Sequence, residues 1–169
     1  MAYFRLFVPK QAVGANLVYF DLFNAAGTGE SLFVKSVRPV VSGAAAVTGV
    51  LGVDLLLTRT TAVGTGGTAA TAEGTDTTAC TISANASGVA LHASITARLT
   101  PSGGATAGAV IAWDTVFTEE TTGTYASSLS LVDRDLPVIV HPGSGIRVVQ
   151  GAVASVGNIG FNVTFQFGR

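Results

Sequence analysis

Charged side chains are scarce in this sequence of 169 residues. Asp, Glu, Lys and Arg make up 11% of it, against about 25% in an ordinary soluble domain. Hydrophobic residues reach 48%, and the mean hydropathy is +0.53. A solitary globule needs surface charge to stay soluble. We therefore expect neutral polar residues to cover part of the surface and other protein chains to cover much of the rest.

Clusters of basic residues are also missing. The nine Lys and Arg residues are spread singly along the sequence, and the formal net charge is −1. Nucleic-acid binding requires clustered positive charge that displaces counterions from phosphates. Aromatic residues stand beside basic ones, as in single-strand-binding sheets, only at Phe4-Arg5, Phe33-Lys35 and Phe167-Arg169. Core aromatics with a snorkelling basic neighbour explain such pairs more often, so we expect no nucleic-acid partner.

Long apolar runs and disulfides are absent as well. No run of 18 or more uncharged apolar residues could form a membrane-spanning helix, and we expect no membrane partner. Arg5, Pro9 and Lys10 interrupt the apolar character of the first twenty residues, which indicates that they are not a secretory leader. Cys80 is the one cysteine and cannot form an internal disulfide. This fits synthesis in a reducing cytosol and is compatible with later residence outside the cell.

Recognisable catalytic and cofactor motifs are not found. The two histidines are His92, on the polar face of an expected strand, and His141, which precedes a proline turn. Neither accompanies a G-x-S-x-G nucleophile elbow. The Gly-rich pieces 64–67 and 143–145 lack the lysine and the following helix of a phosphate-binding loop. We predict a non-enzymatic protein with no catalytic residues and no cofactor.

Carboxylates occur close together at two places. Asp133 and Asp135 could contribute to a calcium site, but the further oxygen ligands and the closing Glu of an EF-hand loop are missing. A turn in which Arg134 balances the charge is the simpler interpretation. Glu119 and Glu120 are interpreted as a solvated hairpin tip. We predict no metal site.

What the sequence does contain is period-two alternation, most clearly near its end. Four apolar residues alternate with neutral polar ones over residues 161–167, which predicts a half-buried strand. Burial of the four contributes roughly 6–12 kcal/mol, while ordering the strand costs about 1–2 kcal/mol per residue, so it must join a sheet. We expect a terminal hairpin with the segment around Val148. The four apolar residues are Phe161, Val163, Phe165 and Phe167.

Similar segments recur along the chain, with a turn signal every eight to fifteen residues and no sustained helical periodicity. About eight short strands with Gly-rich turns predict an all-β fold, an antiparallel β-sandwich or barrel, in a single domain over residues 17–169. The expected strands after the N-terminal segment are residues 17–23, 31–41, 50–60, 91–99, 110–118, 127–132, 136–140 and 161–167.

The first eight residues alternate too, but both faces are apolar, and Pro9 ends the pattern. This suits either an N-terminal arm or a first strand covered on two sides, within residues 1–16. As an arm, the segment would dock on a partner, and deletion of residues 1–9 should abolish attachment while leaving a folded oligomer. The predicted partner-binding residues are Tyr3, Phe4, Leu6 and Phe7.

Residues 61–88 are dominated by Thr, Ala and Gly, and a structureless loop of this length is uncommon in a compact domain. Two interpretations stay open: an extended surface excursion that a neighbouring subunit orders, or disorder. A separate question is sugar binding, for which Trp113 and Tyr125 are the best aromatic candidates. Trp113 shares a face with Ile111 and Phe117, which favours a place in the core.

The order of these segments carries a resemblance. The Phe-Asn-Ala-Ala-Gly turn at 23–27 precedes Leu-Phe-Val-Lys-Ser-Val-Arg-Pro-Val at 32–40, and the Thr/Gly/Ala excursion follows. Two further stretches close the pattern. They are Pro-Val-Ile-Val-His-Pro-Gly-Ser-Gly-Ile at 137–146 and the Phe-Asn-Val-Thr-Phe-Gln-Phe strand at 161–167. From Leu17 to Phe167 the chain resembles the small jelly-roll virion proteins of tailed bacteriophages, which include capsid decoration (cement) proteins and head-fibre or tail modules.

The resemblance implies a jelly-roll β-sandwich that assembles as a homotrimer and binds the major capsid protein or other virion proteins. It places the protein on the capsid surface of a virion after synthesis in the host cytoplasm. The expected function is that of a decoration protein which reinforces the phage head. The alternatives are a tail or head-fibre component and a carbohydrate-binding jelly-roll module.

Overall fold

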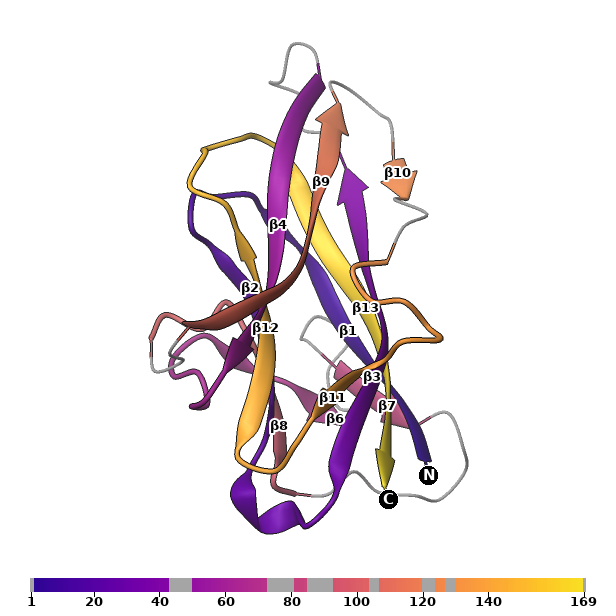
Figure 1. Ribbon diagram of the computed structural model, residues 1–169. Coiled ribbons are helices and arrows are strands. Elements are labelled where there is room, and N and C mark those ends of the chain that lie inside the picture. The colour runs from indigo at the N-terminus through magenta and orange to yellow at the C-terminus, as the bar shows by residue number, and fades with distance from the viewer. Residues whose placement is uncertain are drawn as a thin grey trace.

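The computed structural model describes residues 2–42, 50–72, 81–84, 93–103, 107–119, 124–126 and 130–168. Two β-sheets pack face to face in this part of the chain (Figure 1), and the one helical element is the short 3-10 helix η1 (Ala26–Thr28). The predicted all-β sandwich is therefore confirmed. Its strands are β1 (Ala2–Ala12), β2 (Val18–Asn24), β3 (Ser31–Ser42), β4 (Val50–Thr60), β5 (Thr68–Ala69), β6 (Thr71–Ala72), β7 (Thr81–Ala84), β8 (Ile95–Leu99), β9 (Ala107–Glu119), β10 (Thr124–Ala126), β11 (Val138–Val140), β12 (Ser144–Gln150) and β13 (Asn158–Gly168).

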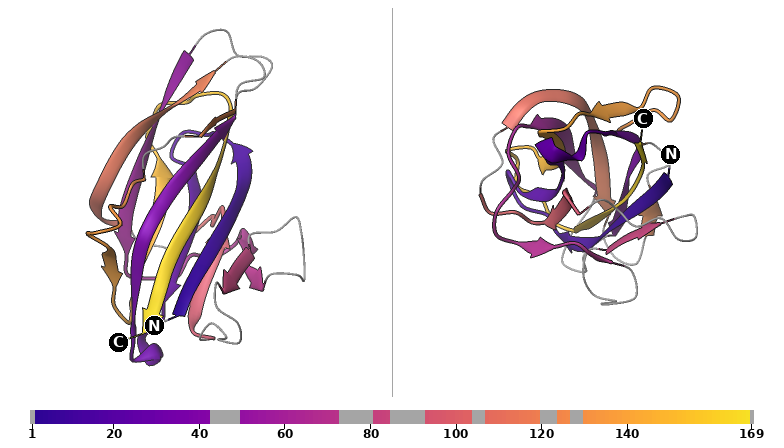
Figure 2. Two further views of the ribbon diagram at one scale, coloured as in Figure 1. Left: turned by 90° about the vertical axis from the view of Figure 1, so that its right-hand side faces the viewer. Right: turned by 90° about the horizontal axis from the view of Figure 1, so that it is seen from below.

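The two sheets differ in size. A seven-stranded sheet has the order β10-β3-β13-β1-β7-β6, with β11 also paired to β3. A six-stranded sheet has the order β5-β8-β2-β12-β4-β9. All of these pairs are antiparallel except β6 with β7. The two views in Figure 2 show the long strands of both sheets running along the same axis of the molecule.

The core lies between the sheets and is built from the inward side chains of alternating strands. Phe161, Val163 and Phe165 of β13 are at most 1% exposed, as the alternation predicted, whereas Phe167 at the strand end is only partly buried. The Phe4 and Phe165 rings stack with centroids 5.5 Å apart. The Tyr19 ring lies 5.2 Å from that of Phe161. Each fully buried side chain of this kind contributes roughly 1.5–3 kcal/mol.

The first strand is central rather than peripheral. β1 pairs with β13 on one side, from Ala2 opposite Phe167 to Ala12 opposite Asn158, and with β7 on the other. Both chain ends therefore lie at the same end of the molecule (Figure 1). Of the two alternatives for the N-terminal segment, an arm or a first strand, the structure shows a first strand. The expectation that residues 1–9 form a removable arm is wrong, because their deletion would take a strand out of the middle of the sheet.

The expected terminal hairpin is also wrong. β12 belongs to the six-stranded sheet and β13 to the seven-stranded one, so residues 151–157 cross from one sheet to the other. The alternation shows that each segment buries one face, but it does not show which sheet the segment joins.

Within the expected strand 127–132, residues 127–129 lie outside the described residues. Residues 130–132 are not a strand, although Leu131 and Val132 are buried.

The remaining predicted strands differ mainly at their ends. Residues 17–23, 31–41, 50–60 and 110–118 correspond to β2, β3, β4 and β9. The expected strand 91–99 begins only at Ile95, after a turn at 93–94, and residues 91–92 lie outside the described part. The predicted excursion 61–88 contributes the short strands β5, β6 and β7 where it is described, while 73–80 and 85–88 lie outside the described residues.

Candidate functional site

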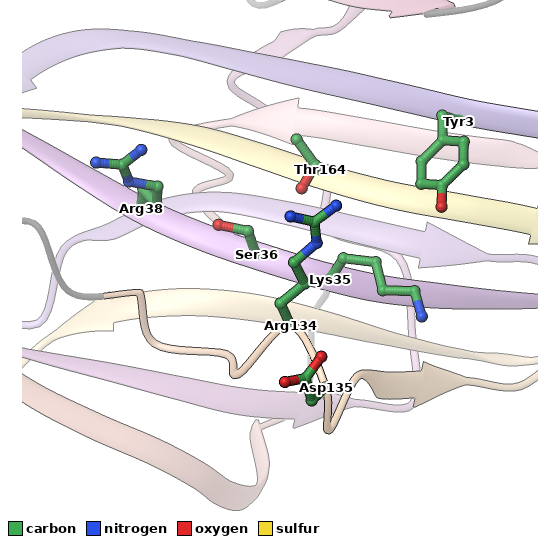
Figure 3. Close-up of a pocket in the computed structure, with 7 residues that line it drawn as sticks. All are labelled: Tyr3, Lys35, Ser36, Arg38, Arg134, Asp135 and Thr164. Atoms are coloured by element: carbon green, nitrogen blue, oxygen red, sulfur yellow. The ribbon is translucent and has the colours of Figure 1, made fainter.

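A groove of about 600 Å³ opens on the outer face of the seven-stranded sheet (Figure 3). It lies over β1, β13 and β3 and is bordered by the turn that precedes β11. Its residues are mostly polar or charged, in contrast to the apolar inner face of the same three strands. We call it the cationic groove. It is lined by Tyr3, Lys35, Ser36, Arg38, Arg134, Asp135 and Thr164.

A bulge in β3 brings two successive residues to this groove. Thr164 of β13 is opposite Ser36, but the next residue, Phe165, is opposite Val34. Lys35 is therefore the extra residue of a β-bulge, which redirects side chains locally. As a result Lys35 and Ser36 both line the groove, although neighbouring residues in a regular strand point to opposite faces.

The turn at 133–136 supplies Arg134 and Asp135. Asp133 Oδ1 accepts a hydrogen bond of 2.9 Å from the Asp135 backbone N–H, and the Asp133 carbonyl accepts one of 3.2 Å from Leu136 N–H. The preceding Ser130 Oγ accepts a 2.9 Å hydrogen bond from Val37 N–H of β3, which ties the segment to the sheet. The predicted turn is confirmed. Figure 3 shows the Arg134 side chain extending from this turn towards Lys35 and Ser36 of β3.

The cationic groove has more positive than negative groups. Lys35, Arg38 and Arg134 line it, and Asp135 is the one carboxylate among its lining residues. Arg5 lies next to it on the outer face of β1, where its backbone pairs with Thr164. Within the described residues, no carboxylate forms an ion pair with the three cations that line the groove. Folding thus brings Arg134 to the same groove as Lys35 and Arg38, which lie far from it in the sequence.

The predicted partner-binding residues separate into two pairs. Tyr3 and Phe7 are 48% and 43% exposed on the outer face of β1, and Tyr3 lines the cationic groove. Phe4 and Leu6 are at most 2% exposed and face the core. Successive residues of a strand point to opposite faces, so Phe4 and Leu6 cannot reach a partner while β1 stays in the sheet. A partner-binding role for Tyr3 and Phe7 stays a prediction.

A second surface feature lies on β9, an edge strand of the six-stranded sheet. Trp113 is 71% exposed, Phe117 57% and Ile111 36%, and all three lie on the outer face. We call these residues the β9 patch. The predicted core position of Trp113 is wrong: Val116, which faces the opposite way, is buried instead. Both faces of β9 carry apolar residues, so alternation alone does not tell which of them is covered. The Tyr125 side chain lies outside the described part of the structure.

A buried carboxylate lies beneath the loop that follows β4. Asp21 of β2 is fully buried, and its Oδ2 accepts a hydrogen bond from Gly64 N–H. Its backbone pairs with Arg98 on one side and with Arg147 on the other. Burial raises the pKa of Asp21, although the backbone N–H groups of Gly64 and Arg98 and the charges of both arginines oppose this. Oδ1 has no hydrogen-bond partner within the described residues.

The other candidate residues of the sequence are not assembled into a site. His141 Nδ1 lies 3.2 Å from Ser31 Oγ at the surface, while His92 and Cys80 lie outside the described residues. No group of three or more potential metal-ligating side chains forms among the residues that the structure describes. None of the described segments is a helix of the length and apolarity that crossing a bilayer demands.

Sequence reasoning missed Lys35, Arg38 and Arg134 as neighbours. One signal pointed towards them: the outward residues of the 161–167 run are polar but neutral, which is unusual for a fully solvated face. Of these residues, Thr164 lines the groove beside the three cations. No protein-family model, curated protein or solved structure matches the chain.

Proposed function

We propose that this chain is a non-enzymatic structural protein of a virion, which assembles as a homotrimer and binds the phage head as a decoration protein. The observation that carries the proposal is the β9 patch, a row of large apolar side chains on an edge strand of a chain that has few charges. Such a row is a liability in a monomer and a ready contact surface in an assembly.

We also propose that the sandwich is a jelly roll. Eight of the strands have the orders β1-β13-β3-β10 and β2-β12-β4-β9, and every one of these pairs is antiparallel. Pairing of the first strand with the last, and of the second with the second last, is the pattern of two nested Greek keys. Jelly rolls of this kind occur in viral capsid domains and in lectins.

The β9 patch favours a second copy of this chain as its cover. Burial of a Trp or Phe side chain contributes roughly 1.5–3 kcal/mol, and aromatic side chains are enriched at interface centres. β9 is the last strand of the six-stranded sheet in the described part of the chain and pairs there with β4 alone, which suits a contact with a neighbouring subunit along its other edge. One repeated contact of this type closes a ring when the rotation between copies is suitable.

The oligomeric state tests the assembly. Light scattering coupled to size exclusion should give the mass of a trimer for the native protein and of a monomer for the double variant Trp113→Ser, Phe117→Ser. The matched control is Val153→Ser, since Val153 is also 71% exposed but lies on the 151–157 connection. A native protein that is monomeric at micromolar concentration would contradict the proposal.

Binding to the head tests the decoration role. A protein that binds only the assembled shell stabilises it by mass action, so its addition to undecorated heads should raise their disruption temperature. An unchanged temperature would contradict the decoration role and leave the tail or head-fibre component as the structural alternative.

The carbohydrate-binding alternative gains support from one observation. An exposed Trp is a usual platform for a sugar ring, and Trp113 is exposed rather than buried. A glycan array separates the two proposals: binding of a neutral glycan that Trp113→Ser abolishes, with an unchanged oligomeric state, would favour the carbohydrate-binding module.

A further inference from the structure

The floor of the cationic groove carries neutral hydrogen-bonding groups. Thr164 of β13 and Ser36 of β3 both line it and lie opposite each other, and Asn162 and Gln166 are the neighbouring outward residues of β13. Hydroxyl side chains both donate and accept hydrogen bonds. They therefore suit a ligand that also does both, such as one rich in hydroxyl groups.

The charged side chains surround this floor and do not form a continuous row. Lys35 and Arg38 come from β3, and Arg134 comes from the turn that borders the groove. Arginine binds carboxylate, sulfate and phosphate groups with two parallel hydrogen bonds. Asp135 stands among these cations and can accept a hydrogen bond from a hydroxyl, whereas it repels an anion that carries a charge on every unit.

An aromatic wall completes the groove. Tyr3 lines it from β1, and its ring is about half exposed. In Figure 3 the Tyr3 hydroxyl points from β1 towards the β3 side of the groove. A tyrosine offers a flat apolar face together with a polar end, which matches the mixed surface of a sugar ring. The volume of about 600 Å³ lies within the usual range of small-ligand sites.

We propose that the cationic groove binds an acidic oligosaccharide. Lys35, Arg38 and Arg134 hold its carboxylate or sulfate groups, the Ser36 and Thr164 hydroxyls hydrogen-bond its hydroxyl groups, and Tyr3 packs against a sugar ring. A nucleic acid fits less well, because its affinity depends on many phosphate contacts and the groove offers three cations beside one carboxylate. An acidic peptide segment fits less well too, because it carries few hydroxyl groups to pair with the Ser36 and Thr164 hydroxyls.

Titration calorimetry of the native protein tests this proposal with four probes: a hyaluronan-derived octasaccharide, which carries a carboxylate on every second sugar, a neutral cello-oligosaccharide, an octathymidylate and inorganic sulfate. The octasaccharide should bind, and its affinity should fall as salt rises. Arg134→Gln and Lys35→Gln should each weaken binding about fivefold, the effect of one exposed charge pair. Lys10→Gln, which removes one exposed charge of β1 outside the groove, should leave binding unchanged. Asp135→Asn should strengthen it about threefold.

Each other outcome overturns the proposal. Equal binding of the neutral oligosaccharide would show that the cations do not take part. Equal or tighter binding of the octathymidylate would assign the groove to nucleic acid, and saturation by sulfate at the octasaccharide's affinity would reduce it to a simple anion site. Absence of octasaccharide binding would also reject it.

Thermal unfolding should be the same for the four variants. The double variant Trp113→Ser, Phe117→Ser should bind normally, because the β9 patch belongs to the other sheet, and this separates a failure here from a failure of the proposed assembly.

Discussion

The Tyr19 hydroxyl donates a hydrogen bond of 2.8 Å to Gln150 Oε1 in the interior of the sandwich, although 131 residues separate the two in the sequence. The same Oε1 accepts a 2.8 Å hydrogen bond from Gly14 N–H, and Gln150 Nε2 donates one of 3.1 Å to the Val153 carbonyl. Gln150 is 1% exposed, so these bonds supply the partners that its buried amide needs. Burial raises the pKa of Tyr19, which keeps the hydroxyl protonated and able to donate.

Replacement of Tyr19 by Phe should lower the free energy of unfolding by about 1 kcal/mol, because it removes one buried hydrogen bond and keeps the ring. Urea denaturation measures the change. Tyr3→Phe is the matched control, since Tyr3 is 48% exposed, and it should leave the midpoint unchanged. Equal effects of the two substitutions would contradict the buried role of the Tyr19 hydroxyl.

The two faces of β1 should differ sharply in their sensitivity to substitution. Phe4→Ala should cost about 3–5 kcal/mol, because Phe4 is 2% exposed and stacks on Phe165. Phe7→Ala should change the free energy of unfolding by no more than about 0.5 kcal/mol, since its ring is on the surface. Chemical denaturation of both variants decides the matter: a peripheral arm would give two small and similar values.

The close approach of the loop after β4 to Asp21 predicts a requirement for glycine at position 64. A Cβ there would overlap Asp21 Oδ2 and would lie 2.7 Å from the Pro101 Cβ. Gly64→Ala should therefore destabilise the protein by roughly 1–3 kcal/mol. Gly27→Ala serves as the control, because nothing lies within 4 Å of the added Cβ. If both variants melt at the native temperature, the loop does not cover Asp21 in solution.

Asp21 should make stability depend on pH in the acidic range. Burial raises its pKa in the folded protein, so the folded chain holds this proton more tightly than the unfolded chain does. The free energy of unfolding should therefore fall as the pH rises from about 3.9, the ordinary Asp value, through the folded-state pKa. Asp21→Asn is neutral at every pH and should remove this fall. Denaturation of both proteins from pH 4 to pH 8 provides the measurement, and parallel curves would contradict the assignment.

Much of the fold could be predicted from the sequence, because alternation reports directly on one-sided burial. The strand at 50–60 was predicted with its observed ends, and the core side chains Phe161, Val163 and Phe165 were identified. Alternation carries no information on which sheet a strand joins, which explains the wrong terminal hairpin. It also fails where both faces are apolar, as at Trp113, whose side of β9 is exposed.

The cationic groove was beyond sequence reasoning for a different reason. Lys35, Arg38 and Arg134 meet only because β3 contains a bulge and because the turn at 133–136 is tied to Val37. Neither the bulge nor the hydrogen bond between Val37 N–H and Ser130 Oγ can be recognised from the local sequence. Charges that are sparse in composition can still be concentrated by topology.

The pairing of β1 with β13 also bears on how the chain is made. Translation proceeds from the N-terminal side, so β1 leaves the ribosome long before its partner from Asn158 to Gly168 exists. The centre of the larger sheet must therefore wait until β13 has been made, and contacts so distant along the chain slow folding. Nascent molecules thus expose the apolar side of β1 until then, a period in which chaperone binding would prevent their aggregation.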